Sequence, residues 1–396
     1  MKRPVARAAP NSVRQWNEYV VVSALRDHGP QRISELGETT GLTPAPLGQV
    51  LRSLQAKGWV AVGEPSRNGL GRPAQVFNLC RPAGSVLGLD VGAHAVRAVR
   101  VDLGGTVIAR AAMRLPQGPT EEQRRAAVRD VVEECLGRGE TEEVWLTTLA
   151  VGGHLSPDGG IVRSVAVPEW DGRHPLDILS GLLPSRGFVV NDVRAATWAE
   201  HAVGAAQAYG EVLVAQLGRR PTIGLLFGGI PRRGAHGTAG DMSLNALLPT
   251  EDEMGWLEPF AQSPDPIGDG VRAALAGDEA AIAGACAYVE TIAPALAFAA
   301  SVVDPAVFVV AGALSPLAEH FIGPLKGHLD QHLQQPPVVL TSPLDEFSTA
   351  LGAALMAVEQ VQVALASPSQ GVAPFTKQEF DGLSLTERSL LRAVSS

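Results

Sequence analysis

The chain has 396 residues, of which 45% are hydrophobic and 18% charged, with 43 glycines and 29 prolines. This length is typical of two or three domains, and the composition favours globular structure with many turns over disorder. The formal net charge is −9, yet residues 1–80 carry ten Lys or Arg against five Asp or Glu, or +5, which leaves −14 for residues 81–396. The basic first part is therefore the part to test for nucleic acid binding.

Neither a membrane span nor an exported protein is expected. The longest apolar runs, such as residues 302–314, are interrupted well before the roughly 18 residues that a membrane helix needs. The basic first twelve residues precede a charged, helix-like stretch instead of an apolar signal core. Cys80, Cys135 and Cys286 lie too far apart for a disulfide framework. We therefore expect a reduced, cytoplasmic protein.

Three helices are predicted in the first 57 residues. Val13, Trp16, Val20 and Ala24 recur at helical spacing until Gly29-Pro30 stops the pattern. A second helix is expected over about 33–40, ending at Gly41. Thr43 can cap a third helix, in which Pro44 occupies the first turn and which runs to about Lys57. Their expected shared core is Ile33, Leu36, Leu42, Leu47, Val50, Leu51 and Leu54. This is the pattern of a helix-turn-helix.

Two strands and a basic loop are predicted after the third helix. Residues 59–62 and 75–79 have strand composition, and residues 64–73 lie between them as a wing. A helix can enter the major groove of DNA while a basic loop reaches phosphates or the minor groove. The candidate DNA-contacting residues are Thr43, Ala45, Gln49 and Arg52 on the third helix and Arg67 and Arg72 in the wing. The alternative is a winged-helix domain used for protein contacts or dimerisation.

The acidic body begins with two strands joined by a tight turn, over about 86–92 and 96–101. The first strand ends in Asp90-Val91-Gly92, which places a carboxylate beside an approachable backbone. Without further motifs, this is weak evidence for a site that binds phosphate or metal.

An ordered series of motifs continues through the body. It consists of Asp102-Leu103-Gly104-Gly105, Val151-Gly152-Gly153, Val167-Pro168-Glu169-Trp170, Asn191-Asp192-Val193-Arg194, Gly234-Ala235-His236-Gly237, Ala311-Gly312-Ala313 and Ala350-Leu351-Gly352. In order and spacing, with the Gly71-Arg72-Pro73 wing before it, this series resembles the ROK family of repressors, open reading frames and kinases. The resemblance implies an α/β, actin-like ATPase (ribonuclease H-like) two-lobed body that follows a winged helix-turn-helix domain. The expected divisions are residues 1–80, 81–365 and a linker with a loosely docked tail over 366–396.

The resemblance also implies a sugar site. In sugar kinases that resemble this body, the Asp of an Asn-Asp motif takes the proton of the sugar hydroxyl, and Asp192 matches it as a vestigial base. Residues 188–192 form an apolar strand ending in two polar groups, where α/β folds place ligands, but Asn191-Asp192 can equally be a turn that caps the helix starting near Arg194. Gly153, Asp241 and Glu258 are the other positions that match sugar contacts. The alternative for Asp241 and Glu258 is that each is a solvated carboxylate in a loop. His154 is expected as a surface or core residue.

Other family features are altered. The first phosphate loop has Gly92-Ala93-His94-Ala95 where the family has Gly-Gly-Thr-Lys, and the second has Gly218-Arg219-Arg220-Pro221 in place of Gly-Thr-Gly. The two arginines can bind an anion but cannot copy a glycine-rich cradle. Leu244 and Trp256 stand where the family has a zinc-binding His and Cys. Neither ATP nor zinc is therefore expected as a cofactor.

The leading hypothesis is a homodimeric or tetrameric transcription regulator, a repressor of carbohydrate genes that binds operator DNA and a sugar or sugar-phosphate effector without phosphorylating it. One alternative is an ATP-dependent hexose kinase that carries a DNA-binding domain. Another is a DNA binder that responds to no effector.

Overall fold

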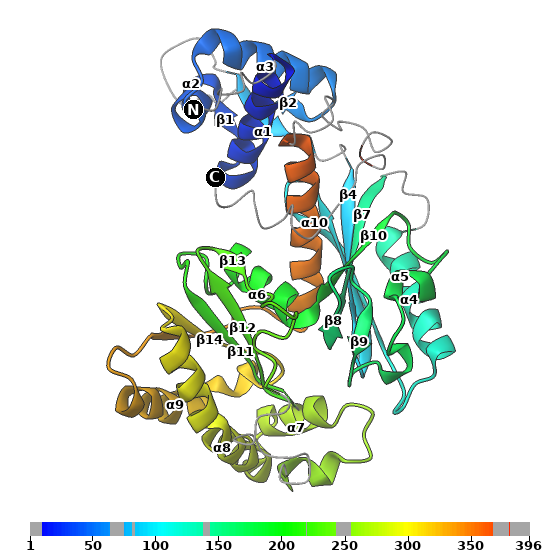
Figure 1. The fold of residues 1–396 in the computed structure, drawn as a ribbon, viewed down its shortest axis with the longest axis vertical. Helices are drawn as coiled ribbons and strands as arrows, with labels where there is room; N and C mark the ends of the chain where they lie inside the picture. The colour runs from blue at the N-terminus through cyan, green and yellow to red at the C-terminus, as the bar shows by residue number, and fades with distance from the viewer. Residues whose placement is uncertain are drawn as a thin grey trace, which may run out of the picture.

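The computed structural model describes residues 10–63, 75–80, 84–137, 143–218, 220–242, 255–366 and Phe380. Figure 1 shows a small head above two larger lobes, each built around a sheet, and α10 (Ser348–Ala366) runs from the lobes up to the head. The fold is a two-lobed, actin-like α/β body preceded by a helix-rich head, as predicted.

The head contains three helices and a three-stranded antiparallel sheet of order β1-β3-β2. Gly41 ends the second helix in the left-handed conformation, at φ 69°, where glycine carries no steric cost. Thr43 occupies the N-cap position of the third helix, but its side chain makes no capping hydrogen bond. The short strand β1 was not predicted. The bounds are α1 (Pro10–His28), β1 (Gln31–Arg32), α2 (Ile33–Thr40), α3 (Pro44–Ala56), β2 (Val60–Val62) and β3 (Val76–Leu79).

The core of the head matches the prediction for α3 but not for α1. Leu36, Leu47, Val50, Leu51 and Leu54 are buried as predicted. Ile33, in contrast, is 43% exposed, so its predicted core role is wrong. Val13 and Trp16 of the predicted apolar stripe of α1 are 52% and 51% exposed, whereas Ala24 of that stripe is buried together with Glu18, Val21, Val22 and Leu25. The buried Glu18 carboxylate lies 3.0 Å from Lys57 Nζ and accepts a hydrogen bond from Ser53, which satisfies its charge.

The first lobe contains a five-stranded sheet of order β10-β7-β4-β5-β6. Strands β4 and β7 are buried along their whole length, because helices cover both faces of this sheet. The predicted hairpin of β4 and β5 is confirmed. The bounds are β4 (Ser85–Val91), β5 (Ala95–Asp102), β6 (Val107–Arg114), α4 (Glu121–Leu136), β7 (Val144–Val151), β8 (His154–Leu155), β9 (Ile161–Arg163), η2 (Pro168–Trp170), α5 (Pro175–Ile178), β10 (Gly187–Asn191) and α6 (Asp192–Ala202).

The second lobe contains another five-stranded sheet, of order β13-β12-β11-β14-β15. Its helices pack beside it to form a separate apolar cluster around Phe308, Phe321 and Leu296. The bounds are β11 (Val212–Gln216), β12 (Thr222–Phe227), β13 (Ile230–Pro231), η4 (Gly255–Phe260), α7 (Pro266–Leu275), α8 (Glu279–Val303), β14 (Val307–Ala311), η5 (Ser315–Leu317), α9 (Ala318–His332) and β15 (Val338–Thr341).

Helix α8 is long and apolar enough to cross a membrane, judged by length and composition alone. Its length was not expected from the sequence, because alanine, and not a run of large apolar residues, supplies much of its apolar character. Tyr288, Ile292 and Leu296 of this helix are buried in the second lobe, and the core helix of a globular domain passes the same test.

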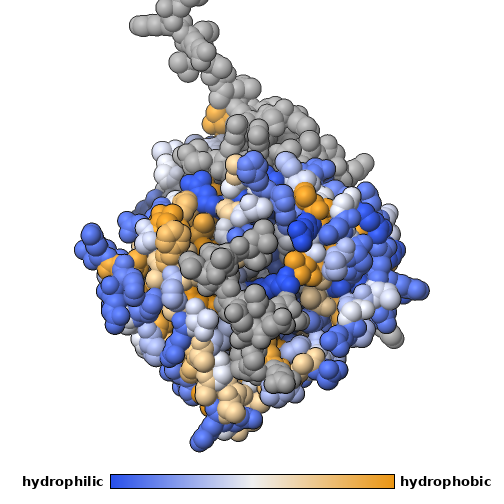
Figure 2. Space-filling view, turned by 60° about the horizontal axis from the view of Figure 1, so that its bottom comes forward, coloured by the Kyte–Doolittle hydropathy of each residue, from blue (hydrophilic) through white to orange (hydrophobic). Residues whose placement is uncertain are grey.

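On the face in Figure 2, hydrophobic residues lie in patches separated by hydrophilic ones.

Helix α10 joins the parts of the molecule. Most of its buried residues belong to an apolar cluster that contains both the head core, including Leu51 and Trp59, and the first-lobe residues Val86 and Trp145. Phe380 of the C-terminal segment belongs to the same cluster and is 0% exposed. The rest of the expected linker and tail after Ala366 lies outside the described residues, so the expectation of loose docking stays a prediction there.

Candidate functional site

A cavity of about 240 Å³ lies between the two lobes. The first lobe contributes the end of β7, the start of β8 and the junction of β10 with α6, while the second lobe contributes β12 and the loop that follows β13. Four of the five predicted sugar-contacting residues line it: Gly153, Asn191, Asp192 and Asp241. The side chain of the fifth, Glu258, lies outside the described residues. The structure thus brings together residues that are almost 90 positions apart in the sequence.

Asn191 and Asp192 hold one end of the cavity and also shape the start of α6. The side chain of Asn191 accepts a hydrogen bond from the Arg194 amide at 3.1 Å, so it caps α6, and its amide group donates to the Gly153 carbonyl at 3.2 Å. The Asp192 Oδ1 atom accepts from the Val193 amide at 2.8 Å and from Asn191 at 3.0 Å. Helix capping and cavity lining are therefore compatible, and the helix begins at Asp192, two residues before the predicted start.

Two consecutive glycines allow close approaches of the chain beside the cavity. A Cβ atom on Gly152 would lie 2.9 Å from Asp192 Oδ2, closer than real Cβ atoms approach another atom. Gly153 adopts φ 125°, where a side chain is strained, and a Cβ there would lie 2.5 Å from the Arg163 carbonyl oxygen. Gly152 therefore leaves room for the carboxylate of Asp192, and Gly153 lets the chain pass close to the end of β9.

Asp192 in the cavity and Asp90, whose charges interact, both have a raised pKa. Burial raises the pKa of Asp192, and the negative charge of Asp241 raises it further, while the hydrogen bond from the Val193 amide and the charge of Arg194 act in the opposite direction. Burial also raises the pKa of Asp90 to about 6; Arg97 opposes this rise and Asp192 adds to it. Perturbed carboxylates that gather at a cleft are typical of a ligand site.

Two basic side chains line the same cavity. His154, expected as a surface or core residue, is half-buried in its wall, and Arg220 enters it from the loop between β11 and β12. Arg220 was noted from the sequence as a possible anion contact, whereas His154 carried no signal beyond its position beside Gly153. Polar groups of both signs therefore face a ligand in this cavity.

The first phosphate loop is engaged in contacts within the protein. The Gly92 amide donates to the Ala95 carbonyl at 3.0 Å, and the Gly92 carbonyl accepts a hydrogen bond from Arg124, which also lies 2.7 Å from Glu169. Nearby, Arg97 binds Asp90 at 3.4 Å and Glu346 at 2.9 Å. The amide and the carbonyl of Gly92 are thus both hydrogen-bonded within the protein.

The other altered family features differ in how far the structure describes them. Gly312 of the Ala311-Gly312-Ala313 motif has φ 85°, and a Cβ on it would lie 2.7 Å from the Leu217 carbonyl oxygen, so packing requires glycine at this position. Leu244 lies outside the described residues, as does the side chain of Trp256. Among the residues that the structure does describe, no group of three or more His, Cys, Asp or Glu side chains could hold a metal ion. The absence of zinc remains a prediction.

The predicted DNA-contacting residues of the head share one surface. Thr43, Ala45, Gln49 and Arg52 are all exposed, and the last three lie on the same face of α3, opposite the buried Leu47, Val50, Leu51 and Leu54. The sequence could not determine this rotation of the helix. The wing residues Arg67 and Arg72 lie outside the described residues.

These features define a class of protein: a two-lobed, actin-like body with a polar cleft, joined to a helix-turn-helix head. Residues 86–251 match the model of the ROK family, which is the family that the order of the motifs predicted.

Curated relatives resemble part of the chain. The xylose repressor of Bacillus subtilis (strain 168) is 23% identical over 237 residues, which are 58% of this chain and 60% of that repressor. The DNA-binding transcriptional dual regulator NagC of Escherichia coli (strain K12) is 22% identical over 233 residues, 58% of this chain and 57% of that regulator. The chain thus spans less than two thirds of the length of these relatives.

Solved structures share the fold over a larger part of the chain. A ROK family transcriptional regulator, a homologue of the Escherichia coli MLC protein, superimposes with a TM-score of 0.66 and 16% identity over 97% of this chain and 100% of that one. A ROK family glucokinase from Streptomyces griseus, solved with glucose and AMPPNP, gives a TM-score of 0.58 and 21% identity over 69% of this chain and 99% of the kinase.

Proposed function

We propose that this protein is a sequence-specific DNA-binding transcription regulator, a repressor of carbohydrate-related genes. The observation that carries the proposal is the exposed face of α3, where Gln49 and Arg52 extend from a helix packed on its opposite side. Glutamine pairs with adenine, and arginine pairs with guanine or phosphate, in the major groove. The resemblance to a transcriptional regulator over 97% of the chain supports this assignment, because it includes the head.

The cavity between the lobes takes a sugar-type effector in this proposal. Asp192 and Asp241 offer carboxylate oxygens to sugar hydroxyls, and Asn191 orients Asp192 through their mutual hydrogen bond. Each lobe supplies part of the lining, so a ligand that prefers one separation of the lobes shifts the population of body conformations. Two relatives whose names include xylose and N-acetylglucosamine support a carbohydrate ligand.

DNA binding is tested by gel shift with the purified full-length protein on the DNA upstream of its own gene. The proposal expects selective binding that weakens steeply as salt increases, because bound phosphates release counterions. A dimer would require half-sites about one helical turn, roughly 34 Å, apart. Equal affinity for the upstream DNA and for unrelated DNA of the same length would overturn the assignment.

A hexose kinase is the second candidate, because the body resembles a glucokinase and Asp192 faces the cavity. The bonded Gly92 amide and the Asp90–Arg97–Glu346 ion pairs argue against a site for ATP. If the protein releases ADP only when sugar is present, and Asp192→Asn abolishes this release, then it is a kinase. That result would contradict the proposal of a regulator that does not phosphorylate its sugar.

A further inference from the structure

The head, the first lobe and the C-terminal segment meet at three aromatic rings. Trp59 follows α3 in the head, Trp145 belongs to β7 and Phe380 comes from the C-terminal segment. The ring centroids of Trp59 and Trp145 lie 5.6 Å apart in an edge-to-face arrangement, and those of Trp145 and Phe380 lie 5.7 Å apart. Trp145 is therefore in contact with a ring from the head and a ring from the C-terminal segment.

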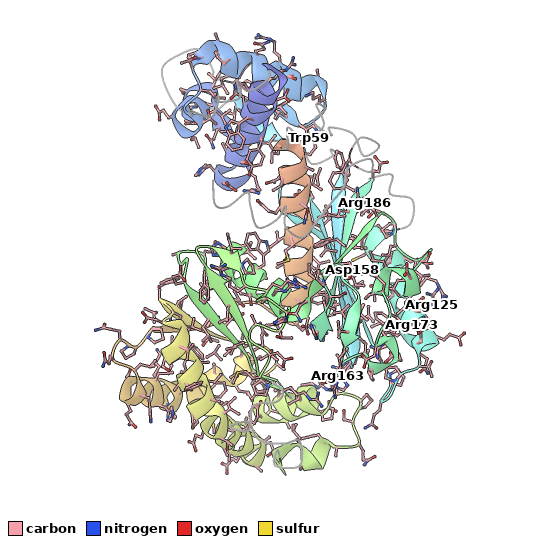
Figure 3. All side chains as sticks on the ribbon, in the orientation of Figure 1. Trp59, Arg125, Asp158, Arg163, Arg173 and Arg186 are labelled. Carbon is pink, nitrogen blue, oxygen red and sulfur yellow. The ribbon has the colours of Figure 1, made fainter. Side chains whose placement is uncertain are left out.

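All three rings are excluded from water. Trp59 is 2%, Trp145 is 3% and Phe380 is 0% exposed, and all belong to the apolar cluster that runs through the head and the first lobe. Figure 3 places Trp59 at the base of the head, beside the end of α10. Phe380, which lies more than 300 positions after Trp59 in the sequence, thus helps to bury the joint between head and body.

The body recognises both the ring and the backbone of Phe380. The guanidinium group of Arg186 lies 5.7 Å from the ring centroid, and its Nη1 atom donates a hydrogen bond to the Phe380 carbonyl at 3.2 Å. On the other side, Gly84 leaves room for the indole, because a Cβ there would lie 2.3 Å from Trp145 Nε1. The surface made by Trp145 and Arg186 is therefore shaped for an aromatic residue of a peptide.

We propose that the C-terminal segment is a clasp, which inserts Phe380 against Trp145 and Arg186 and so fixes the head on the body. The occupant of this surface is the chain's own Phe380. When Phe380 leaves, Trp145 loses this cover, and among the described residues the head keeps its contacts with α10 and the first lobe. The clasp itself requires neither DNA nor sugar, and only its effect on operator binding rests on the proposed function.

The test is Phe380→Ala in the full-length protein, with Phe298→Ala as the matched control because Phe298 is 61% exposed on α8. Amide hydrogen exchange in β2 and β7 and the radius of gyration from small-angle scattering are measured without DNA or sugar. The clasp predicts severalfold faster exchange in these strands and a larger radius for Phe380→Ala alone, because local opening becomes easier.

Unchanged exchange and radius in Phe380→Ala would overturn the clasp. If that variant does not fold, Arg186→Gln decides by the same two measurements, since it removes the recognition of Phe380 and leaves the three rings in place. A failed gel shift would count against the proposed DNA function and not against the clasp, because neither measurement uses DNA.

Discussion

The guanidinium group of Arg26 in the head lies 3.1 Å from the carboxylate of Glu359 in α10, and it also donates to Gln362 of the same helix. The other end of α10 packs on α6, the helix that begins with Asp192 at the cavity. One continuous helix therefore contacts both the cavity side of the body and the head. A change in how α6 packs can reach the head through α10.

Replacing Arg26 with glutamine is expected to weaken the attachment of the head. The pair is partly buried, with 24% of the Arg26 side chain and 14% of the Glu359 side chain exposed, so its loss costs about 1 to 2 kcal/mol of unfolding free energy. Urea unfolding measures this cost. Asp27→Asn is the control, because Asp27 binds the same guanidinium from an exposed position within α1. Equal stability of both variants would show that the contact with Glu359 contributes nothing.

At Gly352, α10 lies very close to the backbone of α6. A Cβ there would lie 1.8 Å from the Ala195 carbonyl oxygen, so Gly352→Ala must push the two helices apart. We expect it to lower the unfolding free energy by about 1 to 3 kcal/mol. Gly323→Ala in α9 is the control, since no atom lies within 4 Å of its added Cβ and alanine favours a helix by about 1 kcal/mol. Thermal unfolding should therefore shift in opposite directions in the two variants.

Asp90 gives the stability a specific pH dependence. Its pKa is about 6 in the folded protein and 3.8 as the ordinary value, so between these pH values the folded state holds a proton that the unfolded state has lost. This contribution to stability is complete below about pH 4 and is lost as the pH rises through about 6, at about 1.4 kcal/mol per pKa unit. Unfolding free energies of Asp90→Asn should therefore fall less than those of the wild type over this window.

Asp158→Asn is the control for this pH dependence. Asp158 is exposed, and its hydrogen bond from Ser156 lowers its pKa, so its contribution to stability is lost only as the pH falls below the ordinary value of 3.8. Parallel curves for Asp90→Asn and the wild type between pH 4 and 6 would contradict the raised pKa of Asp90.

The sequence predicted the family, the element types and most of the cavity, because these depend on ordered motifs and on local periodicity. It did not predict which face of α1 is buried, since the stripe of Glu18, Val21 and Leu25 includes a charge that only the tertiary contact with Lys57 makes acceptable. It also did not predict the burial of Phe380, because a single aromatic residue among polar ones has no period to detect. Contacts between distant segments are thus the part that local patterns leave open.

Arg52→Ala is expected to weaken binding of the upstream DNA. Arg52 is exposed on α3, away from the buried face, so the substitution should leave the fold intact. A phosphate contact would give a uniform loss and lower the salt slope by about 1, whereas a guanine contact would cost about 1 to 3 kcal/mol at one base pair. Gel shifts over a salt series separate the two. Arg129→Ala is the matched control, because Arg129 is an exposed arginine on α4. If the two substitutions weaken DNA binding equally, Arg52 and the face of α3 that carries it do not contact DNA.

Asp192→Asn is expected to weaken sugar binding by about tenfold, because a charged acceptor becomes a neutral one at a difference of about 1.4 kcal/mol. The fold should survive, since the amide oxygen of asparagine can still accept from the Val193 amide. Calorimetric titration with D-xylose, D-glucose and N-acetyl-D-glucosamine measures the loss, and Asp158→Asn, which does not line the cavity, is the control.

The pH dependence of that binding separates a ligand contact from a structural role. As the pH falls, protonation of Asp192 removes the charged acceptor and lowers the affinity for sugar. Because the pKa of Asp192 is raised, this loss should begin at a higher pH than it would for an ordinary aspartate. In Asp192→Asn this decline should be absent, since asparagine does not titrate. If the variant instead binds with wild-type affinity and the same pH profile, then Asp192 serves only to begin α6, and the cavity recognises its ligand through other groups such as Asp241.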